Sequence, residues 1–245
     1  MTVFTYENGE RTGACKDFLL GSGELDGCKM LTILPIPSSR DGIFITGSDI
    51  PLATVIGGAG VGDTILGYGL CDELVASAKG AGAVVVDAAH DEEFLTENAR
   101  LTALATLAYL LSDGVSPPDE KHIGIVGYGR IGRALLRLLL PLGVRVSVYT
   151  TRREVALCLC ESGVDAAFVS EGDPLPHVDI LVNTAPARIF EPDGVGAGCV
   201  LELASGDNYP ELDVTRLSAL PARYYPESAG RAYAMALLRA VGGEG

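Results

Sequence analysis

The sequence has no excess of basic residues. Its 18 Lys and Arg are outnumbered by 32 Asp and Glu, which gives a formal net charge of −14. A chain of this charge repels polyanions, so it is not expected to bind nucleic acid generally or to dock on anionic membranes. A small anionic ligand is still compatible with the sequence, because a local cluster of Arg side chains and backbone N–H groups can override the overall field.

The sequence also lacks a long apolar run and a recognisable export signal. No run approaches the ~20 residues that span a membrane, and the start "MTVFTYENGER" has no basic stretch followed by an apolar one. Of six cysteines, only Cys158 and Cys160 are close together, and no His or second Cys pair follows at zinc-ligand spacing. We therefore expect a soluble, cytoplasmic protein with reduced thiols and no metal site.

Apolar residues are plentiful, at 48% of the chain against 20% charged residues, so a sizeable core can form. Short runs rich in Val and Ile alternate with helical patterns, which predicts a doubly wound, Rossmann-type α/β fold with a second, smaller α/β lobe. The predicted strands are 30–36, 53–58, 83–88, 122–127, 145–150, 166–170, 179–185 and 199–204. The predicted helices are 72–82, 97–114, 132–143 and 153–163.

Two lobes are expected on either side of a long helix of about four turns that begins near Glu97. Residues 1–97 are interpreted as a substrate-side α/β lobe and residues 98–228 as a dinucleotide-binding Rossmann domain. A C-terminal helix at about 229–245 is an element that can pack back on the first lobe. The segment 112–122, "SDGVSPPDEKH", is the best candidate for a linker or tight connection because it is rich in proline and acidic residues.

The most specific motif is the glycine turn in "HIGIVGYGRIGRALLRLL". A predicted strand runs into Gly127-Tyr128-Gly129-Arg130-Ile131-Gly132, and a helix follows at once. Gly127 permits the tight turn, Gly129 lets the backbone approach a pyrophosphate, and Gly132 lets the helix pack against the strand. This context predicts dinucleotide binding through Gly127, Gly129, Arg130 and Ile131 at the positive end of a helix dipole. The alternative is a glycine turn with a purely structural role.

The second strand of this unit ends without the acidic residue that would bind the ribose hydroxyl of NAD. It reads Tyr149, Thr150, Thr151, Arg152, Arg153 instead. Hydroxyl and guanidinium groups suit a phosphate, so we predict that Thr150, Thr151, Arg152 and Arg153 favour NADP, with NAD as the alternative. The competing interpretation is that the two arginines are solvated residues at a helix start.

A second glycine cluster, "GGAGVGDTILGYG" at 57–69, is predicted to follow the strand at 53–58. It lacks the G-x-G-x-x-G spacing, and no Lys-Ser/Thr pair follows to make a phosphate loop. We interpret it as a plain turn or as a lining of the ligand cleft.

Further stretches surround the glycine motif in a fixed order: "ILPIPSSRDG" (33–42), "ENARLTALATLAYLL" (97–111), "NTAPARIF" (183–190) and "LELAS…YYPESAGRAYA" (201–234). Together they resemble the family of dipicolinate synthase A subunits, two-lobed relatives of the D-2-hydroxyacid dehydrogenases, over most of the chain. The resemblance implies an NAD(P)-linked oxidation of dihydrodipicolinate to dipicolinate in sporulating bacteria. It also implies a flavoprotein partner, the B component of that enzyme. A homo-oligomer is expected as well.

Candidate contacts follow from these stretches. A ring with two carboxylates needs hydroxyls and a cation, which Ser38, Ser39 and Arg40 supply on a loop after a strand. Asn98 and Thr102 share one helix face and are candidates for the substrate cleft. Asn183 and Thr184 end a strand and are candidates for contact with the nicotinamide ribose. Each of these groups has an ordinary structural alternative, as a polar turn, a cap or a surface residue.

The sequence also departs from the family pattern. Met1 leads straight into what resembles a later strand, so the family's first strand–helix unit is expected to be missing. Where the family reads Pro-Thr-x-Glu-Gly, the residues 101–105 are Leu-Thr-Ala-Leu-Ala, and where a hydroxyacid dehydrogenase carries its acid–base His, this chain has Glu227. No catalytic residue can therefore be assigned from the sequence. Two alternatives to the oxidoreductase stay open: a non-catalytic nucleotide-binding partner or sensor, and another dehydrogenase of the D-2-hydroxyacid type.

Overall fold

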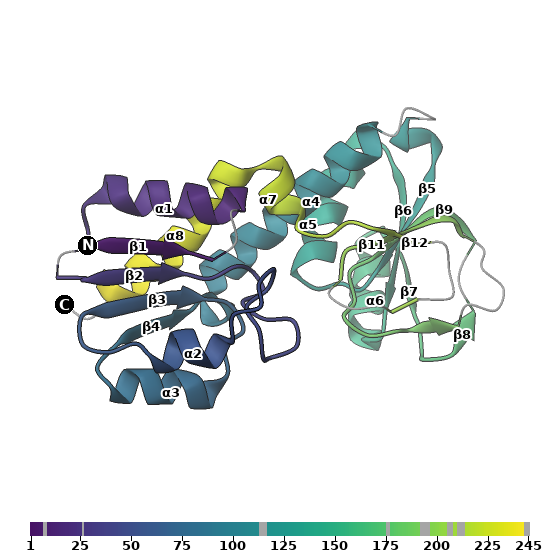
Figure 1. Ribbon diagram of the computed structural model, residues 1–245. Coiled ribbons are helices and arrows are strands. Elements are labelled where there is room, and N and C mark those ends of the chain that lie inside the picture. Colours follow the sequence, from purple (N-terminus) through teal and green to yellow (C-terminus); the bar gives the residue numbers. More distant parts are fainter. Residues whose placement is uncertain are drawn as a thin grey trace. The chain divides into compact units, whose positions relative to one another are not determined.

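The computed structural model describes residues 1–6, 9–25, 27–112, 117–174, 177–191, 197–204, 208–209 and 214–242. The chain forms two compact units, which Figure 1 shows. Unit 1 comprises Met1–Asn98 and Pro221–Gly245, and unit 2 comprises Ala99–Leu220. The long helix α4 (Glu92–Ser112) begins in unit 1 and continues in unit 2. Part of the predicted linker, 113–116, lies outside the described residues.

Unit 1 is built on a four-stranded parallel sheet whose strands lie in chain order. The strands are β1 (Thr2–Thr5), β2 (Met30–Ile33), β3 (Asp63–Gly67) and β4 (Val84–Asp87). All neighbouring pairs are parallel, so the carboxyl ends of the strands lie along one edge of the sheet. The central strands are rich in β-branched and apolar residues and are buried, which is typical of a parallel sheet covered on both faces.

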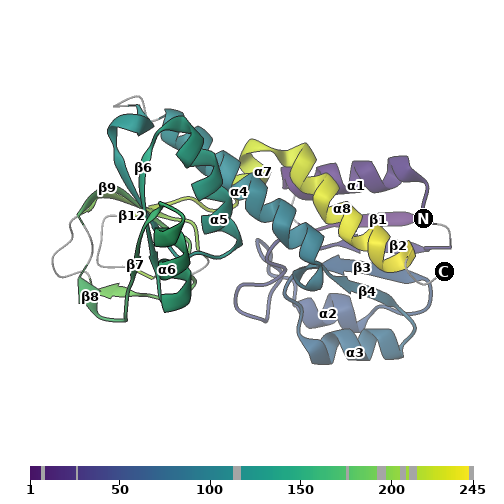
Figure 2. The same ribbon diagram turned by 180° about the vertical axis from the view of Figure 1, so that it is seen from behind.

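Helices cover both faces of this sheet. The helices α1 (Glu10–Ser22) and α8 (Pro226–Gly242) pack against each other on one face, and α2 (Leu52–Gly57) and α3 (Asp72–Gly80) lie on the other (Figure 1). Figure 2, the view from behind, shows α8 lying across this face of the sheet. A β-carbon on Gly230 would come within 2.6 Å of the Cys15 backbone nitrogen, so this glycine sets how closely α1 and α8 approach.

Unit 2 is built on a six-stranded parallel sheet in the order β12-β11-β9-β5-β6-β7. Its strands are β5 (His122–Val126), β6 (Arg145–Thr150), β7 (Asp165–Phe168), β9 (Val178–Asn183), β11 (Ala197–Glu202) and β12 (Val214–Arg216). Two short strands, β8 (Asp173–Pro174) and β10 (Phe190–Glu191), form a separate two-stranded parallel sheet. Besides the end of α4, its helices are α5 (Arg130–Leu139) and α6 (Arg153–Glu161), and α7 (Leu220–Tyr224) begins at its last residue and continues in unit 1. Unit 1 contains the single-turn helix η1 (Ala88–His90), and unit 2 contains η2 (Pro118–Glu120) and η3 (Leu140–Leu142).

The predicted α/β class with parallel sheets is confirmed, but some element predictions are wrong. The predicted strand 53–58 is instead covered by the helix α2, whose N-cap is Pro51 and whose residues Leu52 and Ile56, four residues apart, face the core. The glycine cluster 57–69 therefore follows a helix, and its second half is the buried strand β3. No described helix is both long and apolar enough to cross a membrane.

The N-terminal region differs from the expectation as well. Residues 2–5 form the strand β1 and residues 10–22 form the helix α1, so the chain does not lead straight into a later strand. The sequence pattern does not predict β1 and α1, because β1 is short and half exposed and the apolar residues of α1 do not form one continuous stripe. The long helix α4 also begins earlier than expected, at Glu92.

Candidate dinucleotide-binding site

The glycine turn lies at the carboxyl end of β5, the central strand of unit 2. Gly127 has a φ of +90°, a conformation that favours glycine, and its N–H donates to the carbonyl oxygen of Tyr149 at 2.8 Å. A β-carbon on Gly132 would lie only 2.2 Å from the Gly127 carbonyl oxygen. The sequence prediction for both glycines thus agrees with the structure: Gly127 is required by the backbone conformation of the turn, and Gly132 by the close contact between the turn and the helix α5.

Gly129 differs from its two neighbours in the motif. A β-carbon built on it meets no atom within 4 Å, and its backbone has ordinary extended angles (φ −84°, ψ −158°). It is the N-cap of α5 and provides no side-chain cap, and the first helical hydrogen bond runs from the Arg133 N–H to the Gly129 carbonyl at 3.0 Å. The N–H groups of a first helical turn meet no carbonyl of their own helix, so they can bind an anion. The open space over Gly129 fits a pyrophosphate.

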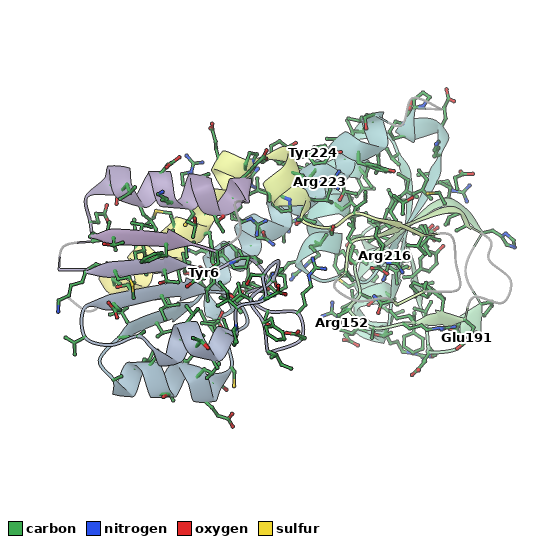
Figure 3. The ribbon with its side chains drawn as sticks, viewed as in Figure 1. Tyr6, Arg152, Glu191, Arg216, Arg223 and Tyr224 are labelled. Atoms are coloured by element: carbon green, nitrogen blue, oxygen red, sulfur yellow. The ribbon has the colours of Figure 1, made fainter. Side chains whose placement is uncertain are left out.

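Arg152 extends from the end of β6 to this turn (Figure 3). Its Nη2 donates to the Tyr128 carbonyl oxygen at 2.7 Å, although the side chain is exposed. A guanidinium in this position brings positive charge to the region between the glycine turn and the second strand, where a Rossmann domain holds the adenosine ribose. The charge suits a ribose phosphate.

The other residues at the end of β6 divide into two groups. Thr150 is 2% exposed and its hydroxyl accepts a hydrogen bond from the Arg152 N–H at 3.3 Å, so it shapes the turn and is not available to a ligand in this structure. Thr151 and Arg153 are exposed at the start of α6. The Arg153 guanidinium lies 5.3 Å from the centre of the Phe168 ring, a cation–π contact that orients it.

Asn183 ends β9 at the same edge of the sheet, but it is fully buried. Its Nδ2 donates to both carboxylate oxygens of Glu202 at 2.9 Å, and its Oδ1 accepts the Ala185 N–H at 3.1 Å. These bonds occupy the amide, so Asn183 orients Glu202 and the chain after β9. The predicted contact with a nicotinamide ribose is not available to its side chain in this structure.

Glu202, at the carboxyl end of β11, is a candidate that the sequence pattern did not predict. It is 4% exposed, and burial raises the pKa of its carboxyl group, while hydrogen bonds from Asn183, the Ala204 N–H and Asn208 oppose that rise. A buried carboxyl group with a raised pKa at the ligand-binding edge of a Rossmann sheet is a candidate functional group. Its only signal in the sequence was an acidic residue at the end of an apolar strand.

Thr184 connects β9 to the glycine turn. Its hydroxyl donates to the Val126 carbonyl oxygen at 2.8 Å, and its N–H donates to the same oxygen at 2.9 Å. The hydroxyl also lies 3.3 Å from the Gly127 carbonyl. Thr184 therefore fixes the height of the turn above the sheet, and the structure gives it a supporting position in the site.

In unit 1, the loop after β2 carries the predicted substrate residues. Ser38 is fully buried, where its hydroxyl donates to the Pro35 carbonyl at 3.2 Å and accepts the Tyr68 N–H at 2.7 Å. Ser39 donates to Asp41 at 3.0 Å and accepts the Gly42 N–H at 2.9 Å. Both serines are occupied within the protein, so the structure does not support their expected role as free donors to a substrate.

Arg40 is exposed and lines a surface pocket of about 280 Å³ together with residues 41 and 44–49. The neighbouring Asp41 accepts the N–H groups of Ile43 and Phe44 and the Ser39 hydroxyl, and these bonds lower the pKa of its carboxyl group. The loop thus carries an ionised carboxylate beside Arg40. This arrangement weakens the attraction that Arg40 exerts on an incoming anion.

The two candidates on α4 lie four residues apart within the helix. Asn98 is half-buried and is the last residue of the first segment of unit 1, whereas Thr102 is 7% exposed and belongs to unit 2. The backbone carbonyl of Thr102 accepts the Thr106 hydroxyl at 2.9 Å. Their contact with a substrate stays a prediction.

The three histidines lie away from the glycine turn or are engaged elsewhere. His122 is at the amino end of β5, opposite the turn, and its Nε2 lies 2.6 Å from the Ser147 hydroxyl, which donates to Asp165. Burial and the nearby Arg145 lower the pKa of His122. His90 is in unit 1 and His177 is exposed before β9. Among the described residues of unit 2, no histidine is placed to act as a base at the glycine turn.

Comparisons with known proteins agree with this geometry. The family described as "D-isomer specific 2-hydroxyacid dehydrogenase, NAD binding domain" matches residues 112–189, which contain β5, the glycine turn and β9. No curated protein sequence matches the chain at a significant level.

Solved structures resemble the whole chain. The A component of dipicolinate synthase from Bacillus halodurans is 17% identical with a TM-score of 0.70, and 98% of this chain and 97% of that chain are covered. The corresponding dipicolinate synthase component from Bacillus subtilis is 19% identical with a TM-score of 0.66, covering 90% and 80%. A transhydrogenase from Sinorhizobium meliloti is 16% identical with a TM-score of 0.55, covering 97% and 91%.

The similarity to these solved structures shows the fold of the chain. The family model adds that residues 112–189 resemble a domain that binds a nicotinamide cofactor. The match covers the residues that form the glycine turn and its supporting strands. Unit 2 therefore has the sequence motif and the Rossmann fold of an NAD-binding domain like that of the D-isomer-specific 2-hydroxyacid dehydrogenases.

Proposed function

We propose that the protein is an NADP-linked oxidoreductase that acts on a small cyclic dicarboxylate, in the manner of the A component of dipicolinate synthase. The observation that carries the proposal is the open space over Gly129 at the start of α5, with the Arg152 guanidinium held at the same turn. A dinucleotide bound there would supply the hydride acceptor. The N–H groups of the glycine turn would hold its pyrophosphate, and Thr151, Arg152 and Arg153 would hold its adenosine phosphate.

We favour oxidation to an aromatic ring over oxidation of a 2-hydroxyacid, because no described histidine lies where it could act as a base at the glycine turn. Oxidation of a 2-hydroxyacid requires a group that removes the hydroxyl proton as hydride leaves, and histidine suits that task near neutral pH. In this chain His122 lies at the opposite end of β5, and Glu227 is exposed at the start of α8. Dihydrodipicolinate loses a hydride and a proton to become an aromatic ring, and ring formation supplies much of the driving force.

Glu202 is the group that can assist near the turn. Because burial raises its pKa, the carboxyl group is protonated over a wider pH range than an exposed one and can donate or accept a hydrogen bond. Asn183 holds it in one orientation. We assign Glu202 a positioning role at the carboxyl edge of the sheet in unit 2.

A second candidate function is a nucleotide-binding partner or sensor without catalysis. The observation in its favour is that the hydroxyls predicted to bind substrate, those of Ser38 and Ser39, are occupied within the protein. The two functions differ in turnover. The test is to supply NADP and dihydrodipicolinate and to follow NADP reduction and dipicolinate formation, with and without the flavoprotein component of a dipicolinate synthase. Turnover supports the oxidoreductase, whereas nucleotide binding without turnover under both conditions supports the sensor.

A further inference from the structure

A second positively charged group, not used in the site above, is buried in unit 1. Arg11 lies in the first turn of α1 and is only 7% exposed. Its Nε is buried without a hydrogen-bond partner, and no described carboxylate forms an ion pair with it. An arginine in this state is unusual, because buried charges are normally paired.

Among the described residues, the ionisable groups that act on Arg11 supply no negative charge near neutral pH. The ionisable groups that act on it are Tyr233, Tyr68 and Cys15. Burial raises the pKa of Tyr233 well above its ordinary value and that of Cys15 to about 12, so both are neutral. The Tyr233 hydroxyl donates its proton to the Leu34 carbonyl at 3.2 Å. Burial is accordingly the main cause that lowers the pKa of Arg11.

The position of Arg11 coincides with the edge of the sheet where ligands of α/β proteins bind. The helix α1 follows the carboxyl end of β1, where Tyr6 is labelled in Figure 3. Tyr68, which acts on Arg11, follows the carboxyl end of β3, and Leu34, whose carbonyl accepts the Tyr233 hydroxyl, follows that of the neighbouring β2.

The start of α1 adds to the positive field there. The N-cap, Gly9, gives no side-chain cap, and a helical hydrogen bond runs from the Gly13 N–H to the Gly9 carbonyl at 3.0 Å. The N–H groups of the first turn, including that of Arg11, point toward the amino end of the helix. The first turn of α1 thus carries both a buried arginine and the N–H groups of a helix amino terminus, and no described carboxylate pairs with that arginine.

We propose that Arg11 is an anion-binding residue that receives a carboxylate of a small organic acid at the carboxyl edge of the sheet in unit 1. The orphaned Nε–H and an Nη–H of one guanidinium edge form a fork that matches the two oxygens of a planar carboxylate. The bound anion supplies the negative charge that Arg11 lacks among the described residues, and this ion pair offsets the free-energy cost of burying the guanidinium. That the anion is the substrate of the enzyme rests on the proposed function; the binding itself does not.

The test is calorimetric titration with pyridine-2,6-dicarboxylate in the absence of nucleotide. The variants are Arg11→Met, which keeps the length of the side chain without its charge, Arg11→Lys, which keeps the charge without the fork, and Arg40→Met as the matched control at an exposed arginine. We expect Arg11→Met to lose at least 100-fold in affinity, Arg11→Lys to lose at least 10-fold, and Arg40→Met to bind as the wild type does. The dicarboxylate should raise the Tm of the wild type but not that of Arg11→Met.

Several results would overturn the inference. They are the absence of dicarboxylate binding to the wild type, unchanged binding to Arg11→Met, binding of inorganic phosphate without binding of the dicarboxylate, and loss of binding in Arg40→Met alone. Arg11→Met should be folded, because removing an unpaired buried charge relieves its desolvation, and thermal unfolding without ligand checks this. NADPH affinity should be the same in Arg11→Met and the wild type. Failure of NADPH binding with intact dicarboxylate binding would reject the proposed function and leave Arg11 as the anion site.

Discussion

Gly129 and Gly132 lie three residues apart in one turn, yet a larger residue at Gly129 should impair dinucleotide binding, whereas one at Gly132 should lower the stability of the fold. Gly129→Val adds atoms where the structure has none within 4 Å, on a backbone with extended angles that valine adopts readily. The fold of unit 2 should therefore persist. The added side chain occupies the space through which a pyrophosphate approaches the N–H groups of α5, so dinucleotide binding should fall by 100-fold or more, or roughly 2.7 kcal/mol.

Gly132→Ala should show the opposite pattern. Its β-carbon would lie 2.2 Å from the Gly127 carbonyl oxygen, far inside an ordinary contact, and the neighbour is backbone and not a flexible side chain. Overpacking of this kind costs about 1–3 kcal/mol, which corresponds to a fall in Tm of roughly 2–12 °C.

The assay is thermal unfolding of both variants together with titration of NADPH and NADH. Gly129→Val should unfold at the wild-type temperature and bind neither cofactor tightly, whereas Gly132→Ala should unfold earlier. A Gly129→Val protein that binds NADPH with wild-type affinity would refute the reasoning, since the ligand would then sit elsewhere.

Three further predictions concern unit 2. Replacing Arg152 and Arg153 together by Ala should erase most of the preference for NADPH over NADH, each charge-assisted phosphate contact being worth about 1.5–3 kcal/mol; an unchanged ratio of the two Kd values would contradict it. Burial raises the pKa of Glu202, so the protonated carboxyl group stabilises the fold below about pH 4.5, and this stabilisation is lost as pH rises through the folded-state pKa. Urea unfolding across this pH range should show the wild type losing stability relative to Glu202→Gln, and a gain in the stability of the wild type relative to Glu202→Gln would contradict the prediction. The pKa of His122 is lowered, so stability should fall as pH drops below about 6.5, and His122→Gln should fall less steeply; parallel curves would contradict it.

The parts of the fold that were predicted from the sequence are those that depend on local chemistry. The strand–turn–helix around Gly127 was predicted because each glycine answers a steric requirement within six residues, and the structure shows those requirements at Gly127 and Gly132. The segment 53–58 was predicted wrongly because a short apolar run fits a strand and a buried helical turn equally well. Only packing decided between them.

The site was harder to predict because its side chains are committed by distant partners. Asn183 pairs with Glu202 across two neighbouring strands, and Ser38 is occupied by the N–H of Tyr68, 30 residues away. Arg11 gave no signal at all, because it is buried in a region that includes Tyr233 of α8, more than 200 residues later in the chain. Residue types alone indicate which side chains can bind a ligand, whereas the fold decides which of their polar groups remain available.

The central claim is that the glycine turn of unit 2 holds NADP with the help of the arginines after β6. Calorimetric titration of the wild-type protein with NADPH and NADH tests it most directly, at fixed ionic strength because phosphate contacts are screened by salt. We predict one binding site per chain, with NADPH bound at least tenfold more tightly than NADH. Equal affinity for the two cofactors, or no binding of either, would contradict the account.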